Sequence, residues 1–600
     1  MITLPLRHAG IPAACGLALL LAAGPASAAS VRRGPAPTPA PAAPGLPIEE
    51  HVLANGMKIL LVPQHVAPTV SGVWIAHVGS VNERPGITGI SHLFEHMMFK
   101  GTHVIGTRDY EKDIALIDEQ ERVRGEMRGE LSKMRVAQRR GEIDDLTKPE
   151  SRTPRYRELE VRFDSLVAEQ RANMIKNEFN LVLQRNGSTG INAFTTEDLT
   201  AYFETLPANK LELWFWIEAD RLKNRVFREF YSERDVVYEE RRRSLESTPT
   251  GKFDESLNST FWTSSPYSWD VIGWPSDVAA ITKAQADDYY ATYYAPQNLT
   301  AMLIGDFDPK TALALAERYL GSIPPGTKPV PEMITSEVPS VAEKRFYAEA
   351  ETNPAVEIRW HTVAFVHKDV PALLALAELL NGPSGRLQKS LVLGGGIATS
   401  ASSESDARKY EGLFSIQAEC KEGHTPEELE KAVDSELGKL QKDPVAADEL
   451  QKVKNRYLAA TYRQMGGGFM LLYRYVLAEG RGTWRDADRI DQAVQTLEAG
   501  DIQRVAQKYF AKENRTVAIW TRKGGAGPED PALANLPPEA KGMARQMLAR
   551  IDGMTEAAQV QKLLERLDAM GASVPPEMKP AMDLVRAKAQ AKLNLLSNPK

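Results

Sequence analysis

The sequence predicts an α/β (α+β) protein with two homologous domains, each a mixed, mostly antiparallel sheet packed with helices. Two observations carry this prediction. The chain has 600 residues, of which 43% are hydrophobic and 25% charged, so it is globular and too long for a single core. It also contains a long internal repeat, and such a repeat indicates duplicated domains.

Residues 1–29 predict a cleavable secretory signal. A weakly basic start is followed by the apolar stretch GLALLLAAG and by PASAAS, which offers small residues for cleavage after Ala28 or Ala29. The apolar stretch is short for a membrane span, and an uncleaved anchor is the alternative. Residues 30–46 are a Pro/Ala linker without a core. We expect a periplasmic or secreted protein with no integral membrane span in its mature form.

The first domain is expected over residues 47–332. VLANGMKILLVP places an Asn-Gly turn between apolar runs, which predicts a hairpin, and SGVWIAHVGS follows as a buried strand. ISHLFEHMMFKGT then has the apolar spacing of a helix. A charged helical hairpin is expected as an insertion at residues 107–180. Two apolar stripes with helical spacing predict it: Val123, Met127, Leu131 and Met134, then Leu159, Phe163, Leu166 and Met174.

The repeat places the second domain at residues 336–522, after the Pro-rich segment IPPGTKPVPE. Its copies are TKAQADDYYATYYAPQNLTAMLIG near residue 282 and EAGDIQRVAQKYFAKENRTVAIWT near residue 498. Each copy is typical of an amphipathic helix, a short turn and an apolar strand. With an offset of 216 they align at three pairs of residues: Tyr294 and Phe510, Asn298 and Asn514, Thr300 and Thr516. Residues 523–600 are expected to form a helical C-terminal extension.

Charge and cysteine content limit what the chain can be. The 73 basic and 79 acidic side chains give a net charge of −6, which offers no support for nucleic-acid binding. The two cysteines, Cys15 and Cys420, are too few for a disulfide framework or a cysteine zinc site. Removal of the signal would leave Cys420 as the single thiol.

The feature that carries chemistry is the motif HLFEH at residues 92–96. On a helix, residues i and i+4 share a face, so His92 and His96 can reach one metal ion. Zinc accepts two nitrogen ligands and one oxygen ligand and keeps a fourth position for water. Glu95 is placed to take a proton from that water. A structural or solvated His/Glu pair is the alternative. Apolar flanks disfavour it, because a buried polar set without a partner is costly.

A third ligand is offered by the segment SERDVVYEERRRSLE. Glu233 and Glu240 are seven residues apart and therefore share one face of a helix. We expect Glu240 as the third ligand and Glu233 as a carboxylate that orients a ligand. Spacing alone does not separate Glu240 from Glu239. The set predicts one Zn²⁺ per chain.

These segments resemble the pitrilysin/insulinase family of zinc peptidases, the inverzincins, whose HxxEH signature reverses HExxH. The resemblance covers nearly all of residues 48–523 and is strongest for half-length members, similar to the mitochondrial processing peptidase β subunit and bacterial relatives. It is carried by LANGMKILLVP, GITGISHLFEHMMFKGT, GINAFTTEDLTAYFETLP, ERDVVYEE and YYAPQNLTAMLIGDFD. It implies His92 and His96 as zinc ligands and Glu95 as catalytic base. The E-x6-E pattern of the family selects Glu240.

The resemblance also implies a substrate-binding strand. Asn192, Ala193, Phe194 and Thr195 match the family's edge strand, whose main chain would pair with an extended peptide. An ordinary capped edge is the alternative.

One departure from the family implies a partner. Full-length relatives carry an arginine and a tyrosine in their second half that contact substrate. Val392 and Thr399 stand at the matching positions here. The resemblance therefore implies a homologous metal-less subunit that supplies the missing pair, or a homodimer.

The sequence thus predicts a secreted or periplasmic zinc metalloendopeptidase that hydrolyses peptides or unfolded segments. The alternative is a non-catalytic or partner-dependent subunit of a heteromeric processing peptidase. The complete HxxEH motif together with Glu240 argues against a non-catalytic subunit, because such subunits usually lose ligands.

Overall fold

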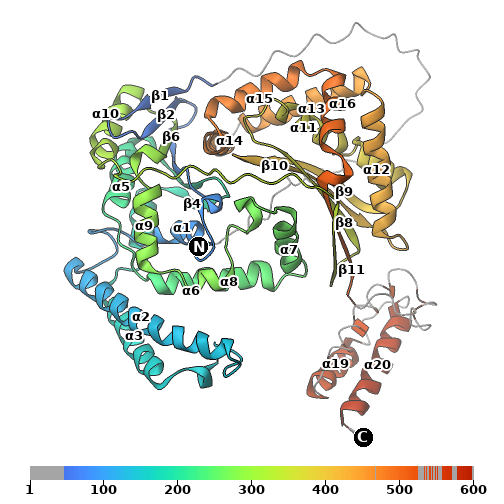
Figure 1. The fold of residues 1–600 in the computed structure, drawn as a ribbon, viewed down its shortest axis with the longest axis horizontal. Coiled ribbons are helices and arrows are strands. Elements are labelled where there is room, and N and C mark those ends of the chain that lie inside the picture. Colours follow the sequence, from blue (N-terminus) through green and yellow to red (C-terminus); the bar gives the residue numbers. More distant parts are fainter. Residues whose placement is uncertain are drawn as a thin grey trace. The chain divides into compact units, whose positions relative to one another are not determined.

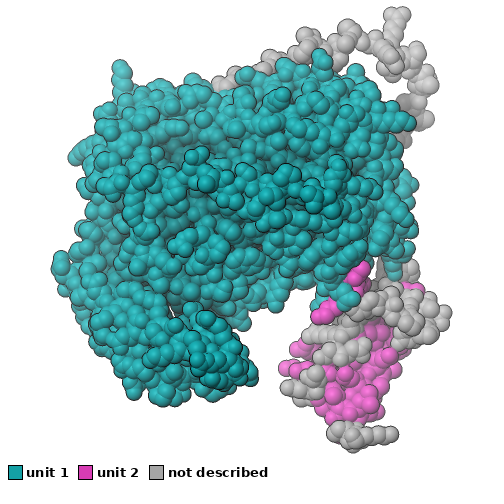
Figure 2. Space-filling model, viewed as in Figure 1, with its two compact units in different colours: residues 1–520 teal, residues 521–600 magenta. Residues whose placement is uncertain are grey.

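The computed structural model describes residues 46–146, 148–465 and 468–523 and part of residues 533–597. The predicted signal at residues 1–29 and the linker, apart from Leu46, lie outside the described residues. The chain divides into two compact units, residues 1–520 and 521–600 (Figure 2). Within the described residues, none of the helices has the length and apolar character that crossing a membrane requires.

In the first half of the larger unit, the described strands form a six-stranded sheet in the order β1-β2-β6-β3-β5-β4 (Figure 1). Strand β2 runs parallel to β6, and the other neighbouring strands are antiparallel. The strands are β1 (Glu49–Val52), β2 (Lys58–Pro63), β3 (Thr69–Ala76), β4 (Thr189–Thr195), β5 (Thr200–Pro207) and β6 (Leu299–Gly305). The helices are α1 (Ile90–Met97), α2 (Tyr110–Arg139), α3 (Pro154–Asn173), α4 (Glu178–Arg185), α5 (Leu211–Lys223), α6 (Phe230–Arg241), α7 (Gly251–Phe261), α8 (Pro275–Val278), α9 (Lys283–Tyr293) and α10 (Pro309–Tyr319).

In the second half, the described strands form a five-stranded sheet in the order β7-β11-β8-β10-β9. Strand β8 is antiparallel to β10 and β11, and β10 is antiparallel to β9. The strands are β7 (Lys344–Ala350), β8 (Ala355–Val363), β9 (Ala398–Ala407), β10 (Glu411–Cys420) and β11 (Arg515–Arg522). The helices are α11 (Val370–Leu380), α12 (Pro426–Lys442), α13 (Ala447–Met465), α14 (Gly468–Arg481), α15 (Trp484–Thr496) and α16 (Ala499–Tyr509). The predicted fold class is confirmed.

A helix from each half packs against the sheet of the other half. Apolar residues of α14, among them Leu471 and Val476, pack on β2, β3, β5 and β6 of the first sheet. Phe253 and Leu257 of α7 in turn pack on Ala518 and Trp520 of β11 in the second sheet. Because each sheet needs the other half to cover one face, the two halves form one compact unit.

The internal repeat is visible in the hydrogen bonds. Helices α9 and α16 both begin at a side-chain cap, in which the backbone N–H of Thr282 or Glu498 donates to the side chain three residues on. After each helix an asparagine amide donates to the carbonyl five residues earlier, from Asn298 at 2.8 Å and from Asn514 at 2.9 Å. The same local sequence therefore folds in the same way twice.

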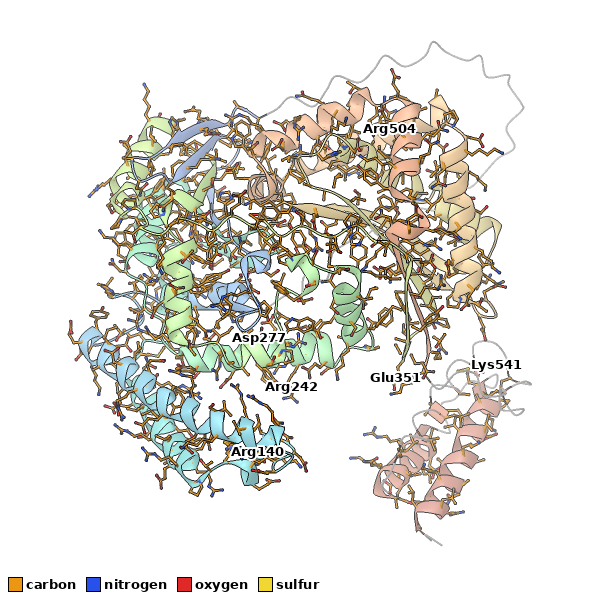
Figure 3. The ribbon with its side chains drawn as sticks, in the orientation of Figure 1. Arg140, Arg242, Asp277, Glu351, Arg504 and Lys541 are labelled. Atoms are coloured by element: carbon orange, nitrogen blue, oxygen red, sulfur yellow. The ribbon has the colours of Figure 1, made fainter. Side chains whose placement is uncertain are left out.

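The expected insertion consists of α2 and α3, which project from the first half as a hairpin (Figure 1). Arg140 caps the C-terminus of α2, at the far end of the hairpin (Figure 3). The expected stripe residues Val123, Met127 and Met134 are buried. The prediction that Met174 belongs to the second helical stripe is wrong, because α3 ends at Asn173 and Met174 lies in an isolated β-bridge with Thr107. In the smaller unit, α19 (Ala557–Met570) and α20 (Lys579–Ser597) share a separate apolar core.

Stability is expected to fall in acid because of His361 on β8. The ring of His361 stacks on that of Phe261, with the ring centroids 3.9 Å apart. This burial lowers the pKa of His361 to about 4. Between about pH 6.5 and pH 4 the unfolded chain therefore binds a proton that the folded chain does not, and stability falls by up to about 1.4 kcal/mol per pH unit. His361→Phe should flatten this slope in urea unfolding at pH 5 and pH 7. An unchanged slope would assign the acid sensitivity to other groups.

Candidate metal centre

Helix α1 carries the HLFEH motif and is held in place by packing. An eight-residue helix is marginal in water by itself. Its apolar residues are fully buried in the core of the first half: Ile90, Leu93, Phe94 and Met97. The helix is therefore fixed by the side chains that surround the two histidines.

The start of α1 is fixed by two carboxylates. Gly89 precedes the helix at φ +88°, and a Cβ there would lie 2.5 Å from the carbonyl oxygen of Ile272, so glycine is required. The Glu83 carboxylate accepts hydrogen bonds from the N–H groups of Gly89 and Ser91, each at 2.8 Å. Asp277, which is labelled in Figure 3, accepts a hydrogen bond from the Thr88 hydroxyl at 2.8 Å. These bonds fix where α1 begins and so hold the HLFEH motif in place within the fold.

Helix α6 lies against α1 and brings Glu240 to the two histidines. The Nε2 atom of His96 lies 3.4 Å from Glu240 Oε2, and the Nε2 atom of His92 lies 3.9 Å from the same oxygen. All three ligand atoms lie within 4.8 Å of one another. Glu233, seven residues earlier on α6, places Oε2 at 3.5 Å from His96 Nδ1. Glu239 is turned away and pairs with Arg242 at 2.8 Å.

The donor set fits a zinc ion. Two imidazole nitrogens and one carboxylate oxygen converge, which is the ligand set of a catalytic zinc site that keeps one position open. Both histidines are buried, with 9% of His92 and 8% of His96 exposed. A carboxylate at the far nitrogen of His96 also matches the way in which zinc-binding imidazoles are usually oriented.

The electrostatics of the centre favour a cation. Burial lowers the pKa of His92. For His96 burial acts in the same direction, but the nearby carboxylates of Glu233 and Glu240 outweigh it and raise the pKa to about 9. Burial would raise the pKa of both glutamates, yet the contacts to His96 lower it. With Glu95 included, three carboxylates surround two imidazoles, so a positive charge at this point is stabilised.

Glu95 is tied to strand β4. The hydroxyl of Thr195 donates to Glu95 Oε2 at 2.7 Å. Side chains alternate along a strand, so Ala193 and Thr195 face α1. Phe194 faces the other way and contacts the ring of Tyr473 on α14 at 5.2 Å. Of the four residues expected in the substrate strand, two therefore point toward the centre and two away from it.

Strand β4 is the outer strand of the described sheet, next to β5. Asn192 is exposed, whereas Ala193 and Phe194 are buried. The outer edge carries main-chain groups that β5 does not use, and such an edge can add an extended peptide as a further strand. The edge passes directly beside Glu95 through Thr195.

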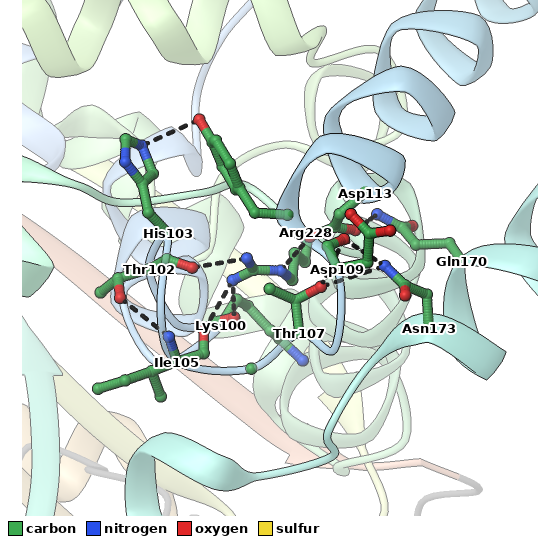
Figure 4. Close-up of polar contacts among 12 residues, drawn as sticks. Lys100, Thr102, His103, Ile105, Thr107, Asp109, Asp113, Gln170, Asn173 and Arg228 are labelled. Carbon is green, nitrogen blue, oxygen red and sulfur yellow. Dashed lines mark hydrogen bonds and ion pairs between the residues drawn. The ribbon is translucent and has the colours of Figure 1, made fainter.

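Three contributors to the centre were missed from the sequence. Thr195 was expected to contribute only its main chain, but its hydroxyl donates to Glu95. Lys100, whose Nζ lies 2.5 Å from Glu233 Oε1, continues the i+4 spacing of His92 and His96, a signal that could have found it. Arg228 is fully buried and donates to the carbonyl oxygens of the loop after α1 (Figure 4). Nothing in the local pattern marks Arg228.

Two family models match the chain. Residues 58–120 match the model described as Insulinase (Peptidase family M16), and residues 280–457 match the model described as Peptidase M16 inactive domain. In these two segments the chain is similar to the insulinase family, peptidase family M16. The first match contains His92, Glu95 and His96. The second match lies outside these residues and outside Glu240, and most of it falls in the second half of the chain.

Relatives of the chain include proteins named as zinc proteases. PqqE of Helicobacter pylori is 25% identical over 490 residues, which are 80% of this chain and 93% of the relative. The uncharacterized zinc protease YmxG of Bacillus subtilis is 21% identical, over 71% of this chain and 84% of the relative. A probable zinc protease, PqqL of Escherichia coli, is 24% identical over 47% of this chain and 24% of the relative.

Solved structures share the two-domain M16 fold. A protease from Helicobacter pylori matches with a TM-score of 0.64 and 22% identity, over 79% of this chain and 99% of that chain. The periplasmic protease PqqL from Escherichia coli matches with a TM-score of 0.58 and 17% identity, over 81% of this chain and 49% of that chain. The match therefore spans about half the length of PqqL.

The segment expected to carry an arginine and a tyrosine lies in the second half. Val392 stands in a π-helical turn, Gln388–Gly394, and packs at the edge of the second core. Thr399 is exposed on β9 and its hydroxyl donates to Glu419 Oε1 at 3.0 Å. Neither side chain is cationic or aromatic, so neither can clamp a peptide in the way expected of the family pair.

Proposed function

We propose that this chain is a zinc metalloendopeptidase that hydrolyses peptides or unfolded segments. The position of Glu95 carries the proposal. It adjoins His96 in the sequence, interacts electrostatically with both His92 and His96, and accepts a hydrogen bond from Thr195 on the outer strand β4. A base, a metal site and a peptide-binding edge thus lie together. The names of the relatives as zinc proteases support the same chemistry.

Metal binding, proton transfer and peptide binding are assigned to different residues. His92, His96 and Glu240 would hold the zinc ion, and the bound ion would supply polarisation of the scissile carbonyl and a lowered pKa of the attacking water. Glu95 accepts the proton of the attacking water and passes it to the leaving amine. The peptide lies along β4 and is held by main-chain hydrogen bonds, so its side chains contribute little to binding.

We propose a periplasmic or secreted location, on the basis of the signal predicted at residues 1–29. The periplasmic PqqL structure with the same fold supports it. A second candidate function is a partner-dependent subunit. Val392 and Thr399 favour it, because a homologous metal-less subunit, or a second copy of this chain, would then complete peptide binding.

The proposal is tested by hydrolysis of quenched fluorescent peptides by the mature chain, with and without a chelator. We expect cleavage that the chelator abolishes and zinc restores. A zinc-loaded chain that cleaves nothing by itself would favour the partner-dependent subunit. A chain that retains no zinc would overturn the proposal.

The third ligand is tested by a matched pair of variants. Glu240→Gln should lower zinc affinity by more than about 100-fold, since even the loss of a group that only orients a ligand costs about 10–100-fold. Glu239→Gln is the control, because this carboxylate pairs with Arg242 at the surface. Zinc content after dialysis measures both. Equal zinc retention in the two variants would contradict the assignment of Glu240.

A further inference from the structure

The inserted hairpin, α2 and α3, contacts the first turn of α6. Arg171 of α3 donates to Glu229 Oε1 and to Ser232 Oγ, both at 3.3 Å. From α2, Arg128 Nη1 donates to the Tyr231 hydroxyl at 3.2 Å, and the guanidinium of Arg124 lies 4.5 Å from the Tyr231 ring. Both helices of the hairpin therefore contact the first turn of α6, the helix that carries Glu240.

Glu229 joins this contact to the loop after α1. It precedes α6 with φ +54°, a left-handed conformation that a residue other than glycine adopts only when its surroundings hold it. Its two carboxylate oxygens have different partners, Arg171 at 3.3 Å on Oε1 and Lys100 at 3.5 Å on Oε2. The hairpin and Lys100 are thus bound to opposite sides of one carboxylate.

Lys100 in turn holds Glu233. Its Nζ lies 2.5 Å from Glu233 Oε1, while Glu233 Oε2 lies 3.5 Å from His96 Nδ1. The side chains of Lys100 and Glu233 are mostly buried, with 19% and 14% exposed. A carboxylate fixed at Nδ1 keeps the proton of the imidazole on that atom and leaves Nε2 free to bind a metal.

We propose that Lys100 is a positioning residue for the metal centre and that the inserted hairpin acts on the centre through it. The contacts run in the order Arg171, Glu229, Lys100, Glu233 and His96. Removal of the Arg171 or the Lys100 side chain should loosen Glu233 and so weaken metal binding. The inference rests on the zinc site of the proposed function and assigns a role to the hairpin within it.

The test is zinc affinity, measured by competition with a chromophoric chelator on the full mature chain. Lys100→Met removes the charge and keeps the length of the side chain, and we expect a 10–100-fold loss of affinity. Lys100→Arg restores a cation and should recover most of that loss. A merely structural role would not be rescued by charge in this way.

The part played by the hairpin is tested at its surface. Arg171→Ala changes a side chain that is 58% exposed and should lower zinc affinity several-fold. Arg162→Ala is the matched control, because Arg162 lies on the same helix, is 54% exposed and pairs with Glu119 of the hairpin itself, at 3.5 Å. Equal affinities in these two variants would overturn the role of the hairpin.

The outcomes separate the inference from the function on which it rests. Wild-type affinity in Lys100→Met would overturn the positioning role even if the wild-type chain binds zinc and cleaves peptides. A wild-type chain that binds no zinc would overturn the metal centre itself, and the inference with it. Thermal unfolding of each variant without zinc should match the wild type, so that a loss of affinity reports the centre and not the fold.

Discussion

Glu95→Gln is expected to lower kcat for peptide hydrolysis by about 10²–10⁴-fold while the chain keeps its zinc. General acid–base catalysis contributes about that factor, and glutamine cannot accept a proton from water. The amide keeps the size of the side chain and can still accept the hydrogen bond from Thr195. Stopped assays on a quenched peptide give kcat, and metal analysis of the same sample gives zinc content.

Two results would contradict this prediction in different ways. Cleavage by Glu95→Gln at the wild-type rate would exclude Glu95 as the base. Loss of zinc together with loss of activity would mean that the substitution disturbs the centre, since Glu95 adjoins His96. Thr195→Val is a useful companion, because it removes the hydroxyl donor and leaves the carboxylate in place. We expect it to lower kcat with less effect on KM.

Helical spacing accounts for the part of the centre that the sequence predicts. His92 and His96 are related by i+4, and Glu233 and Glu240 by i+7, so each pair was expected on one face. The rotation of α6 about its axis was not available from spacing. It is set by packing, which turns Glu240 toward His96 at 3.4 Å and leaves Glu239 on the surface beside Arg242.

The contacts missed from the sequence all join segments that are distant along the chain. Thr195 meets Glu95 across 100 residues, and Lys100 meets Glu233 across 133 residues. No local periodicity encodes such a pair. The exchange of α7 and α14 between the two sheets was likewise outside local patterns, although the repeat predicted that two similar halves exist. Fold class follows from local signals, whereas the placement of partners follows from tertiary packing.

Arg228→Met is expected to lower the free energy of unfolding by about 3–5 kcal/mol, the usual cost of removing one partner from a buried ion pair. Arg228 and Asp113 form an ion pair and both side chains are fully buried. The guanidinium also donates to the carbonyl oxygens of Lys100, Thr102 and Ile105 (Figure 4). Methionine fills similar space but leaves the Asp113 charge unpaired at the base of the hairpin.

Chemical denaturation measures this cost, and a double variant identifies its source. If the unpaired carboxylate dominates, Asp113→Asn combined with Arg228→Met should be more stable than Arg228→Met alone. If the lost donors to the loop dominate, the double variant should be no more stable than the single one. Arg162→Ala, an exposed change on the same hairpin, should stay within about 0.5 kcal/mol of the wild type. A cost for Arg228→Met no larger than that would mean that the buried pair does not anchor the insertion to the loop behind the metal centre.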